Sequence, residues 1–157
     1  MGNRAVIAFR DVRCSGIGIY LHSNGGRASV EAFLRVAKDL GVRADDYGIA
    51  RLCQIIGNYF GGSLSIGCGR LEHLDRDNGD NGVYRVKDWK IIGRDYFETE
   101  FDEVDPTKTD AIYKDCMSVN GPIFGSIDGP KSSFHAVDPA TTPAGWDTAG
   151  TDLGMDD

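Results

Sequence analysis

This 157-residue chain has no long apolar runs and no closely paired cysteines, and both absences limit the classes of protein to which it can belong. Its apolar runs are only a few residues long, whereas a membrane-spanning helix needs about 20 residues. The N-terminal residues do not have the layout of a signal peptide. The four cysteines form no C-x-x-C pair and have no histidine at zinc spacing, which favours buried free thiols. We therefore expect a cytosolic protein without a membrane partner, a metal site or a cofactor.

Familiar catalytic motifs are missing as well. The sequence contains no G-x-S-x-G, no G-K-[ST] and no H-E-x-x-H, and its three histidines are scattered. The acidic run Asp75–Gly82 resembles a calcium loop, but Asp80 stands where that loop needs glycine and Val86 where it needs a bidentate acid. We interpret this run as a hairpin turn, because Asn-Gly precedes a β-rich stretch. These absences predict a protein that is not an enzyme.

Charge divides the chain into two chemically different parts. Residues 1–94 hold 14 Lys and Arg against 10 Asp and Glu, a formal charge of +4, and 11 of the 14 are arginine. Residues 95–157 hold 3 basic against 14 acidic residues, a formal charge of −11. Arginine pairs with phosphate through two parallel hydrogen bonds and stacks on flat rings. Anion binding is therefore expected in the first part, despite the net acidity of the whole chain.

Hydrophobic spacing predicts two consecutive helices. Apolar residues recur at helical spacing over residues 28–40, and Gly41 is a suitable C-terminal cap. A second helix is predicted over residues 46–60, with Asp45 or Asp46 as its N-terminal cap.

Short β-rich runs flank these helices on both sides. Residues 4–9 and 17–22 read as one antiparallel pair, joined by a polar connection. Leu64, Ile66 and Cys68 alternate with small residues, and this run is predicted to pair as a strand with the return segment 83–97. The fold class is thus α+β, with antiparallel strand pairs flanking two consecutive helices in a ligand-binding domain over residues 1–105.

Residues 106–157 form a Pro/Gly/Asp-rich C-terminal extension that we expect to be partly ordered at most. A short helix is predicted over residues 110–117, with strands near 123–127 and 134–137. Residues 138–157 have almost no apolar periodicity and cannot bury enough surface to offset their ordering entropy. They are predicted to form a mobile acidic tail.

Three features of the first part could bind an anion. Asn24-Gly25-Gly26-Arg27 opens a predicted helix, where backbone N–H groups and the helix dipole favour negative charge. Arg51 and Asn58 share a polar helix face with Gln54. Arg94 stands at a strand end. The alternatives are an ordinary glycine turn, a solvated helix face and an ion pair between Arg94 and Asp95.

Three segments are distinctive together, namely Gly2–Ile7, Tyr20–Arg27 and Arg51–Asn58. They resemble a known family, the first type of Thoeris anti-defence protein, from phages of Gram-positive bacteria. That resemblance implies a sponge that sequesters cyclic ADP-ribose isomers without cleaving them, in the cytoplasm of the infected host. It also implies cyclic oligonucleotides as a second ligand class and a homo-oligomer with pockets between subunits, and it implies no binding of duplex nucleic acid.

The resemblance implies that arginines, an asparagine and an aromatic ring hold the ligand. Arg27, Arg51, Asn81 and Arg94 are the polar candidates in this chain. Phe60, Tyr84 and Trp89 compete for the position of the stacking ring.

Two other functions stay open at this point. An acidic inhibitor could use the −11 charge of residues 95–157 to cover the basic groove of a defence nuclease. A nucleotide phosphodiesterase would need an acid–base pair or a metal, and the sequence has neither at a recognisable spacing.

Overall fold

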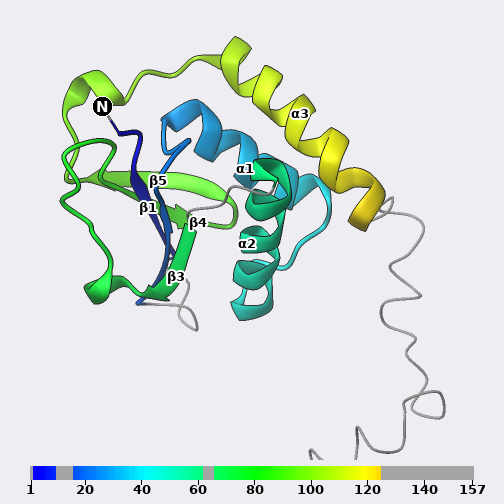
Figure 1. Ribbon diagram of the computed structural model, residues 1–157, viewed down its shortest axis with the longest axis horizontal. Coiled ribbons are helices and arrows are strands. Elements are labelled where there is room, and N and C mark those ends of the chain that lie inside the picture. The colour runs from blue at the N-terminus through cyan, green and yellow to red at the C-terminus, as the bar shows by residue number, and fades with distance from the viewer. Residues whose placement is uncertain (1, 10–15, 62–65, 125–157) are drawn as a thin grey trace, which may run out of the picture. The chain divides into compact units, whose positions relative to one another are not determined.

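The computed structural model describes residues 2–9, 16–61 and 66–124, which belong to one compact unit ending at Phe124 (Figure 1). This unit is α+β, as the sequence predicts, with a mixed sheet in the order β3-β2-β1-β4-β5. Its strands are β1 (Ala5–Phe9), β2 (Ile17–Leu21), β3 (Ile66–Arg70), β4 (Val83–Lys87) and β5 (Lys90–Asp95). Its helices are α1 (Arg27–Asp39), α2 (Asp46–Phe60) and α3 (Pro106–Phe124), with short 3-10 turns η1 (Leu71–His73) and η2 (Thr99–Phe101).

Strand β1 is the centre of the sheet because its sequence, Ala-Val-Ile-Ala-Phe, is apolar on both faces. All five of its residues are buried. It pairs antiparallel with β2, where Ile7 lies opposite Ile19, which confirms the first predicted strand pair. On its other side it pairs parallel with β4, where Ile7 lies opposite Tyr84. This parallel pair departs from the wholly antiparallel arrangement that we expected.

The second predicted strand pair is wrong. Strand β3 pairs antiparallel with β2, placing Cys68 opposite Ile19. Residues 83–95 instead form their own hairpin, β4–β5, which turns at Asp88 and Trp89 with φ of 50° and 61°. Two consecutive positive φ values are the mark of the tight turns that suit the twist of a hairpin.

The run Asp75–Gly82 is therefore not a hairpin turn but a loop between strands that are not neighbours. The buried Asn78 side chain organises it. Its Nδ2 donates to the carbonyl oxygens of Asp75 and Gly82, and its Oδ1 accepts from the N–H groups of Asp80 and Gly82. The asparagine side chain here replaces the hydrogen bonds of a backbone turn. The sequence pattern therefore predicted a turn-forming segment correctly, but not which strands it connects.

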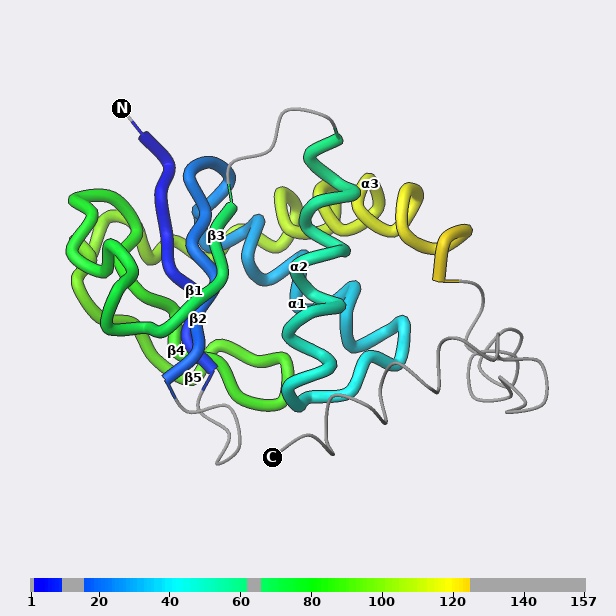
Figure 2. Tube along the Cα trace, turned by 60° about the horizontal axis from the view of Figure 1, so that its bottom comes forward, coloured from blue at the N-terminus to red at the C-terminus, as the bar shows by residue number. Residues whose placement is uncertain are grey.

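Both predicted central helices are confirmed. In α1 the residues at helical spacing, such as Val30, Phe33 and Ala37, are buried, and Gly41 follows the helix with φ of 71°. At the start of α2 the Asp45 side chain accepts a hydrogen bond from the Gly48 N–H at 3.2 Å. All three helices lie on one side of the sheet, whereas the segment between β3 and β4 lies on the other (Figure 2). That segment contributes Leu71 and Leu74, which cover the second face of the sheet.

Helix α3 extends well beyond the short helix predicted at 110–117, and the boundary predicted at residue 105 falls inside the compact unit. The helix packs on α1 and α2 and buries Cys116 completely. Ile123 and Phe124, the first residues of a predicted strand, belong to its last turn. The rest of that strand, the one near 134–137, and the predicted mobile tail lie outside the described residues.

Candidate functional site

Four of the predicted site residues, Arg27, Asn81, Tyr84 and Arg94, meet in one network. Asp102, which follows η2, is at its centre. One of its carboxylate oxygens accepts from Arg27 Nη1 and, at 2.7 Å, from Arg94 Nη1. Burial opposes ionisation of this carboxyl, but the two arginine hydrogen bonds outweigh burial and lower the pKa of Asp102. The network therefore contains two cations and a stable internal anion.

Tyr84 and Asn81 connect this network to the backbone. The Tyr84 hydroxyl donates to the Gly25 carbonyl oxygen at 2.7 Å, and burial raises the pKa of that hydroxyl. Asn81 Nδ2 donates to Asn3 Oδ1 at 2.7 Å, and the Asn81 carbonyl accepts from Arg94 Nη2 at 2.7 Å. These contacts fix β4, β5 and the start of α1 to one another.

The Arg94 side chain is only 4% exposed. Its guanidinium carbon lies 3.9 Å from the centroid of the Tyr84 ring and 4.3 Å from that of Phe97. Its ion pair is with Asp102, whereas Asp95 lies 3.1 Å from Arg85 Nε. In this structure Arg94 positions its neighbours and presents almost no surface to a ligand.

The turn before α1 has little room for side chains. Asn24 has φ of 55° and is half-buried. A Cβ on Gly25 would lie 2.6 Å from the Asn3 carbonyl oxygen, so only glycine fits this position. The Gly25 N–H donates to that same oxygen at 2.8 Å. The turn thus holds the start of α1 against the residues that immediately precede β1.

The remaining predicted residues lie on α2. Asn58 Nδ2 donates to Asn120 Oδ1 of α3 at 3.0 Å, so this amide has a structural partner. The Phe60 ring packs edge-on against Phe33, with 6.2 Å between the centroids. Arg51 is exposed and donates to Gln54 Oε1 at 3.0 Å. The structure places none of these three in the Asp102 network.

A groove of about 370 Å³ lies between α1 and the β4–β5 hairpin. Its lining contains four cationic side chains and one acidic side chain, together with apolar walls. From α1 these residues are Arg27, Glu31, Leu34, Arg35 and Lys38, and from the hairpin Trp89, Lys90 and Ile91. Of the sequence candidates, Arg27 and Trp89 line this groove. Positions 27, 31, 34, 35 and 38 share one helix face, so their spacing could have indicated the helical wall.

The positive charge of the groove is uneven. Arg27 pairs with Glu31 at 2.8 Å as well as with Asp102, and Arg35 pairs with Asp110 at 2.6 Å. Among the residues that the structure describes, no ion pair involves Lys38 or Lys90. Both lysines are exposed. The uncompensated positive charge therefore lies at the Lys38–Lys90 end.

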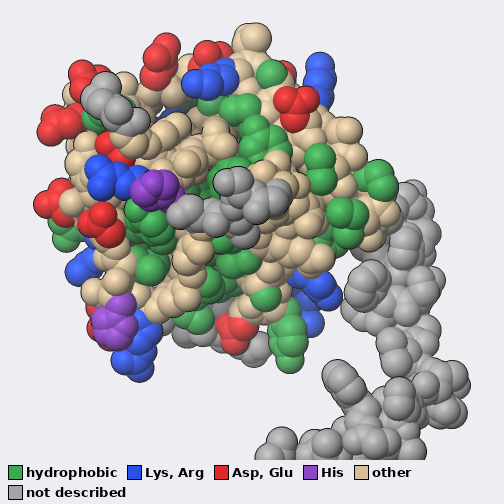
Figure 3. Space-filling view, in the orientation of Figure 1, with side chains coloured by type: hydrophobic (Ala, Val, Ile, Leu, Met, Phe, Trp, Pro, Cys, Tyr) green, Lys and Arg blue, Asp and Glu red, His purple; other side chains and the backbone are tan. Residues whose placement is uncertain are grey.

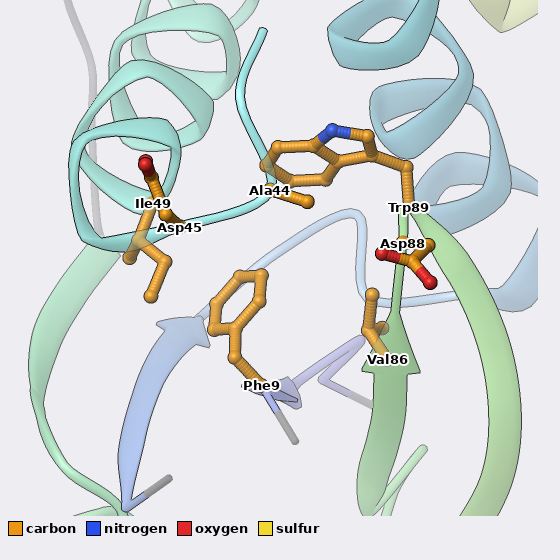
Figure 4. A pocket seen from close by; sticks show the side chains of 7 residues that line it. All are labelled: Phe9, Ala44, Asp45, Ile49, Val86, Asp88 and Trp89. Atoms are coloured by element: carbon orange, nitrogen blue, oxygen red, sulfur yellow. The ribbon is translucent and has the colours of Figure 1, made fainter. Parts of the chain in front are cut away.

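Trp89 gives the groove a fixed wall. Its indole N–H donates to the Val42 carbonyl at 2.9 Å, and its ring meets Phe9 edge-on, with 6.3 Å between the centroids. Figure 4 shows the indole above Phe9, beside Ala44. The side chain is 8% exposed, so only its margin is open to a ligand.

Acidic groups are concentrated elsewhere. On the face of the molecule drawn in Figure 3, many of the acidic side chains lie over the loops that follow β3 and β5. Residues 2–9, 16–61 and 66–124 contain no group of three His, Cys, Asp or Glu residues that could hold a metal ion. No helix of the described part is long and apolar enough to cross a membrane.

Comparison with known proteins gave no match to a family model, to a curated protein or to a solved structure.

Proposed function

We propose that this protein binds a small phosphorylated nucleotide of the cyclic ADP-ribose type in the groove between α1 and the β4–β5 hairpin and holds it without cleaving it. The observation that carries the proposal is the lining, with four cations, one acid and apolar walls. Cationic side chains suit phosphates, and flat apolar walls suit a base or ribose. The family resemblance supplies the specific ligand class and, with it, an anti-defence role in the host cytoplasm. Cyclic oligonucleotides are the second ligand class.

Phosphate groups would bind at the Lys38–Lys90 end. Lys38 is in the last turn of α1, and Lys90 follows Trp89, whose indole N–H donates to the Val42 carbonyl just after that helix. Both lysines therefore lie toward the same end of the groove. A hydrogen bond to a charged group contributes about 1.5–3 kcal/mol, or roughly 10- to 100-fold in affinity. Arg35 adds a third cation, while its ion pair with Asp110 leaves part of its positive charge compensated.

Sequestration without cleavage follows from the same lining. Bond cleavage needs a nucleophile, a metal or a matched acid and base. The described lining has Glu31 as its one carboxylate, and Glu31 accepts from Arg27 Nε at 2.8 Å. The other residues of this lining are cationic or apolar, so Glu31 has no second acid, thiol, hydroxyl or imidazole beside it in the lining to act with.

Titration calorimetry with cyclic ADP-ribose isomers and cyclic oligonucleotides tests the binding site. Lys38→Glu and Lys90→Glu should each weaken binding by roughly 10- to 100-fold or more. Arg70→Glu makes the same charge change on β3, at the opposite edge of the sheet, and should bind like the native protein. Arg51→Glu separates the groove from the α2 face suggested by the sequence. If Arg51→Glu abolishes binding and both lysine variants retain it, the site is on α2.

The fate of the ligand tests sequestration. The protein should remove ligand in proportion to its site concentration, and heating should release the ligand intact. Accumulation of linear ADP-ribose beyond one equivalent per site would identify a hydrolase. Native mass spectrometry of the same sample would give the number of subunits in the proposed homo-oligomer. The proposal would be contradicted if the protein bound no nucleotide of either class.

A further inference from the structure

Two cysteines from different elements, Cys53 of α2 and Cys68 of β3, lie near each other at one edge of the sheet. Cys68 lies in the edge strand β3, opposite Ile19 of β2. Ile19 belongs to the core beneath the helices, and residues paired across two strands point to the same face. Cys68 is therefore directed toward the helices. Cys53 of α2 packs against that same core, and α2 contacts β3 directly. The Cys68 thiol is near enough to Cys53 to help raise the pKa of the Cys53 thiol.

The two thiols differ in exposure. Cys68 is exposed, whereas Cys53 is half-buried. The pair therefore consists of one thiol that is accessible to solvent and a neighbouring thiol that is partly shielded from solvent. Reactive pairs of this kind have an attacking thiol at the surface and a resolving thiol next to it.

We propose that Cys68 is a site of reversible oxidation by hydroperoxides and that Cys53 resolves it to an intramolecular disulfide.

The reaction is a two-electron oxidation. Cys68 loses its proton to solvent, and its thiolate attacks one oxygen of hydrogen peroxide. The O–O bond breaks, and the leaving hydroxide takes up a proton to become water. Cys53 sulfur then attacks the sulfur of the Cys68 sulfenic acid, the S–O bond breaks, and a second water leaves with the Cys53 proton. The two sulfurs are oxidised together by two electrons, and one peroxide is reduced to two waters.

Cys116 provides an internal comparison. It is fully buried under α3, and burial raises the pKa of its thiol to about 12. Burial also raises the pKa of Cys53 to about 12, helped by the neighbouring Cys68 thiol. The first attack therefore belongs to Cys68, because it is the exposed thiol that a peroxide in solvent can reach.

The disulfide would tie the edge strand to α2. It closes a loop of about 15 residues between the two cysteines, which restricts the unfolded chain. For a chain of this size the expected rise in melting temperature is on the order of 5–10 °C. A thiol reductant should reverse the rise.

The test is peptide mapping by mass spectrometry after treatment of the full chain with one equivalent of hydrogen peroxide. The expected product has lost two hydrogens and contains a crosslink between the Cys53 and Cys68 peptides. Cys53→Ala should gain oxygen at Cys68 or form Cys68-linked dimers, because no resolving thiol remains. Cys116→Ala should behave like the native chain.

Two results would overturn the proposal. One is an oxidised native chain in which Cys68 is crosslinked to Cys14 or Cys116. The other is a native chain that acquires no crosslink under conditions that oxidise Cys68. Both results are read on the native sequence, so they do not depend on whether a cysteine variant folds.

Discussion

The guanidinium carbon of Arg94 lies over the ring of Tyr84, 3.9 Å from its centroid, and the Tyr84 hydroxyl donates to the Gly25 carbonyl at 2.7 Å. Arg94 and Tyr84 are directly opposite each other in the β4–β5 ladder. A single stack therefore connects β5, β4 and the turn before α1. Because Arg27 begins α1 and lines the groove, the position of this turn sets one end of the candidate site.

Tyr84→Phe should destabilise the protein by about 1–3 kcal/mol, because it leaves the buried Gly25 carbonyl without its donor. Urea denaturation gives the change in the free energy of unfolding. Tyr20→Phe is the matched control, since the Tyr20 hydroxyl contacts His22 in an exposed position. The control should change stability by less than about 0.5 kcal/mol. Equal effects of the two substitutions would remove the special role of the Gly25 contact.

Asp102→Asn should weaken the network at neutral pH, by about 1–2 kcal/mol given that the carboxylate is 35% exposed. Despite burial, the hydrogen bonds from Arg27 and Arg94 hold the pKa of Asp102 below its usual value of 3.8. The stabilisation is therefore complete above the usual pKa and is lost as the pH falls through the lowered pKa of the folded state.

The check is the free energy of unfolding of both proteins from neutral pH to pH of about 2. The difference between them should be constant above about pH 5 and should shrink below pH of about 4. Asp77→Asn changes an exposed acid of the β3–β4 loop and serves as the control. A difference that persists undiminished in acid would show that Asp102 acts through packing and not through its charge.

Local patterns were sufficient for about half of the fold. The periodicity and caps of α1 and α2, and the pairing of β1 with β2, depend on residues close in sequence, so they could be predicted. The partners of β3 and β4 could not, because strands adjacent in sequence need not be adjacent in the sheet. Helix α3 was underestimated for another reason: its buried residues are Thr109, Cys116 and Asn120, which form no apolar stripe.

The same distinction applies to the site. Arg27 and Arg94 were found from sequence, but their common partner Asp102 is 75 residues from Arg27 and carries no local signal. Arg35 and Lys38 follow from the helical spacing of Arg27, whereas Lys90 joins them only because the β4–β5 hairpin turns back toward α1. A groove formed by distant segments cannot be derived from the pattern of either segment alone.

Asn120→Ala should destabilise the protein by about 2–4 kcal/mol. Asn120 is fully buried, and its Nδ2 donates to the carbonyls of Ile55 and Cys116 at 3.1 and 2.9 Å. Alanine leaves both acceptors, and the Asn58 amide, without their partner. Thermal and urea unfolding measure the loss. Ser118→Ala, an exposed change on the same helix, should leave stability unchanged within about 0.5 kcal/mol.

Truncation tests where the folded unit ends. A chain ending at residue 137 should retain the melting temperature and ligand affinity of the full chain, because residues 138–157 have little apolar surface to bury. A chain ending at residue 105 should lose cooperative unfolding, since it removes α3 and uncovers the core at α1 and α2. If the first truncation lowers the number of subunits found by native mass spectrometry, residues 138–157 are an assembly arm.

Gly48→Ala and Gly121→Ala make the same change inside two helices and should differ strongly in their effect on stability. A Cβ on Gly48 would lie 1.5 Å from the Arg43 carbonyl oxygen, which is backbone and cannot rotate away. The start of α2 would have to move, and we expect a loss of more than about 3 kcal/mol. Apart from its chain neighbours and its own helix backbone, a Cβ on Gly121 would meet the Met117 sulfur at 3.7 Å, an ordinary contact.

At Gly121 the better helix propensity of alanine is opposed by crowding against Pro122, so the free energy of unfolding should change by less than about 1 kcal/mol. Urea unfolding of the two variants beside the native protein measures both changes in the free energy of unfolding. Asp45, Ala44 and Trp89 lie next to the Arg43–Gly48 contact, and Trp89 is also a wall of the groove. Gly48→Ala should consequently weaken ligand binding as well, whereas Gly121→Ala should not. A Gly48→Ala protein as stable as the native chain would mean that the turn before α2 relaxes without cost.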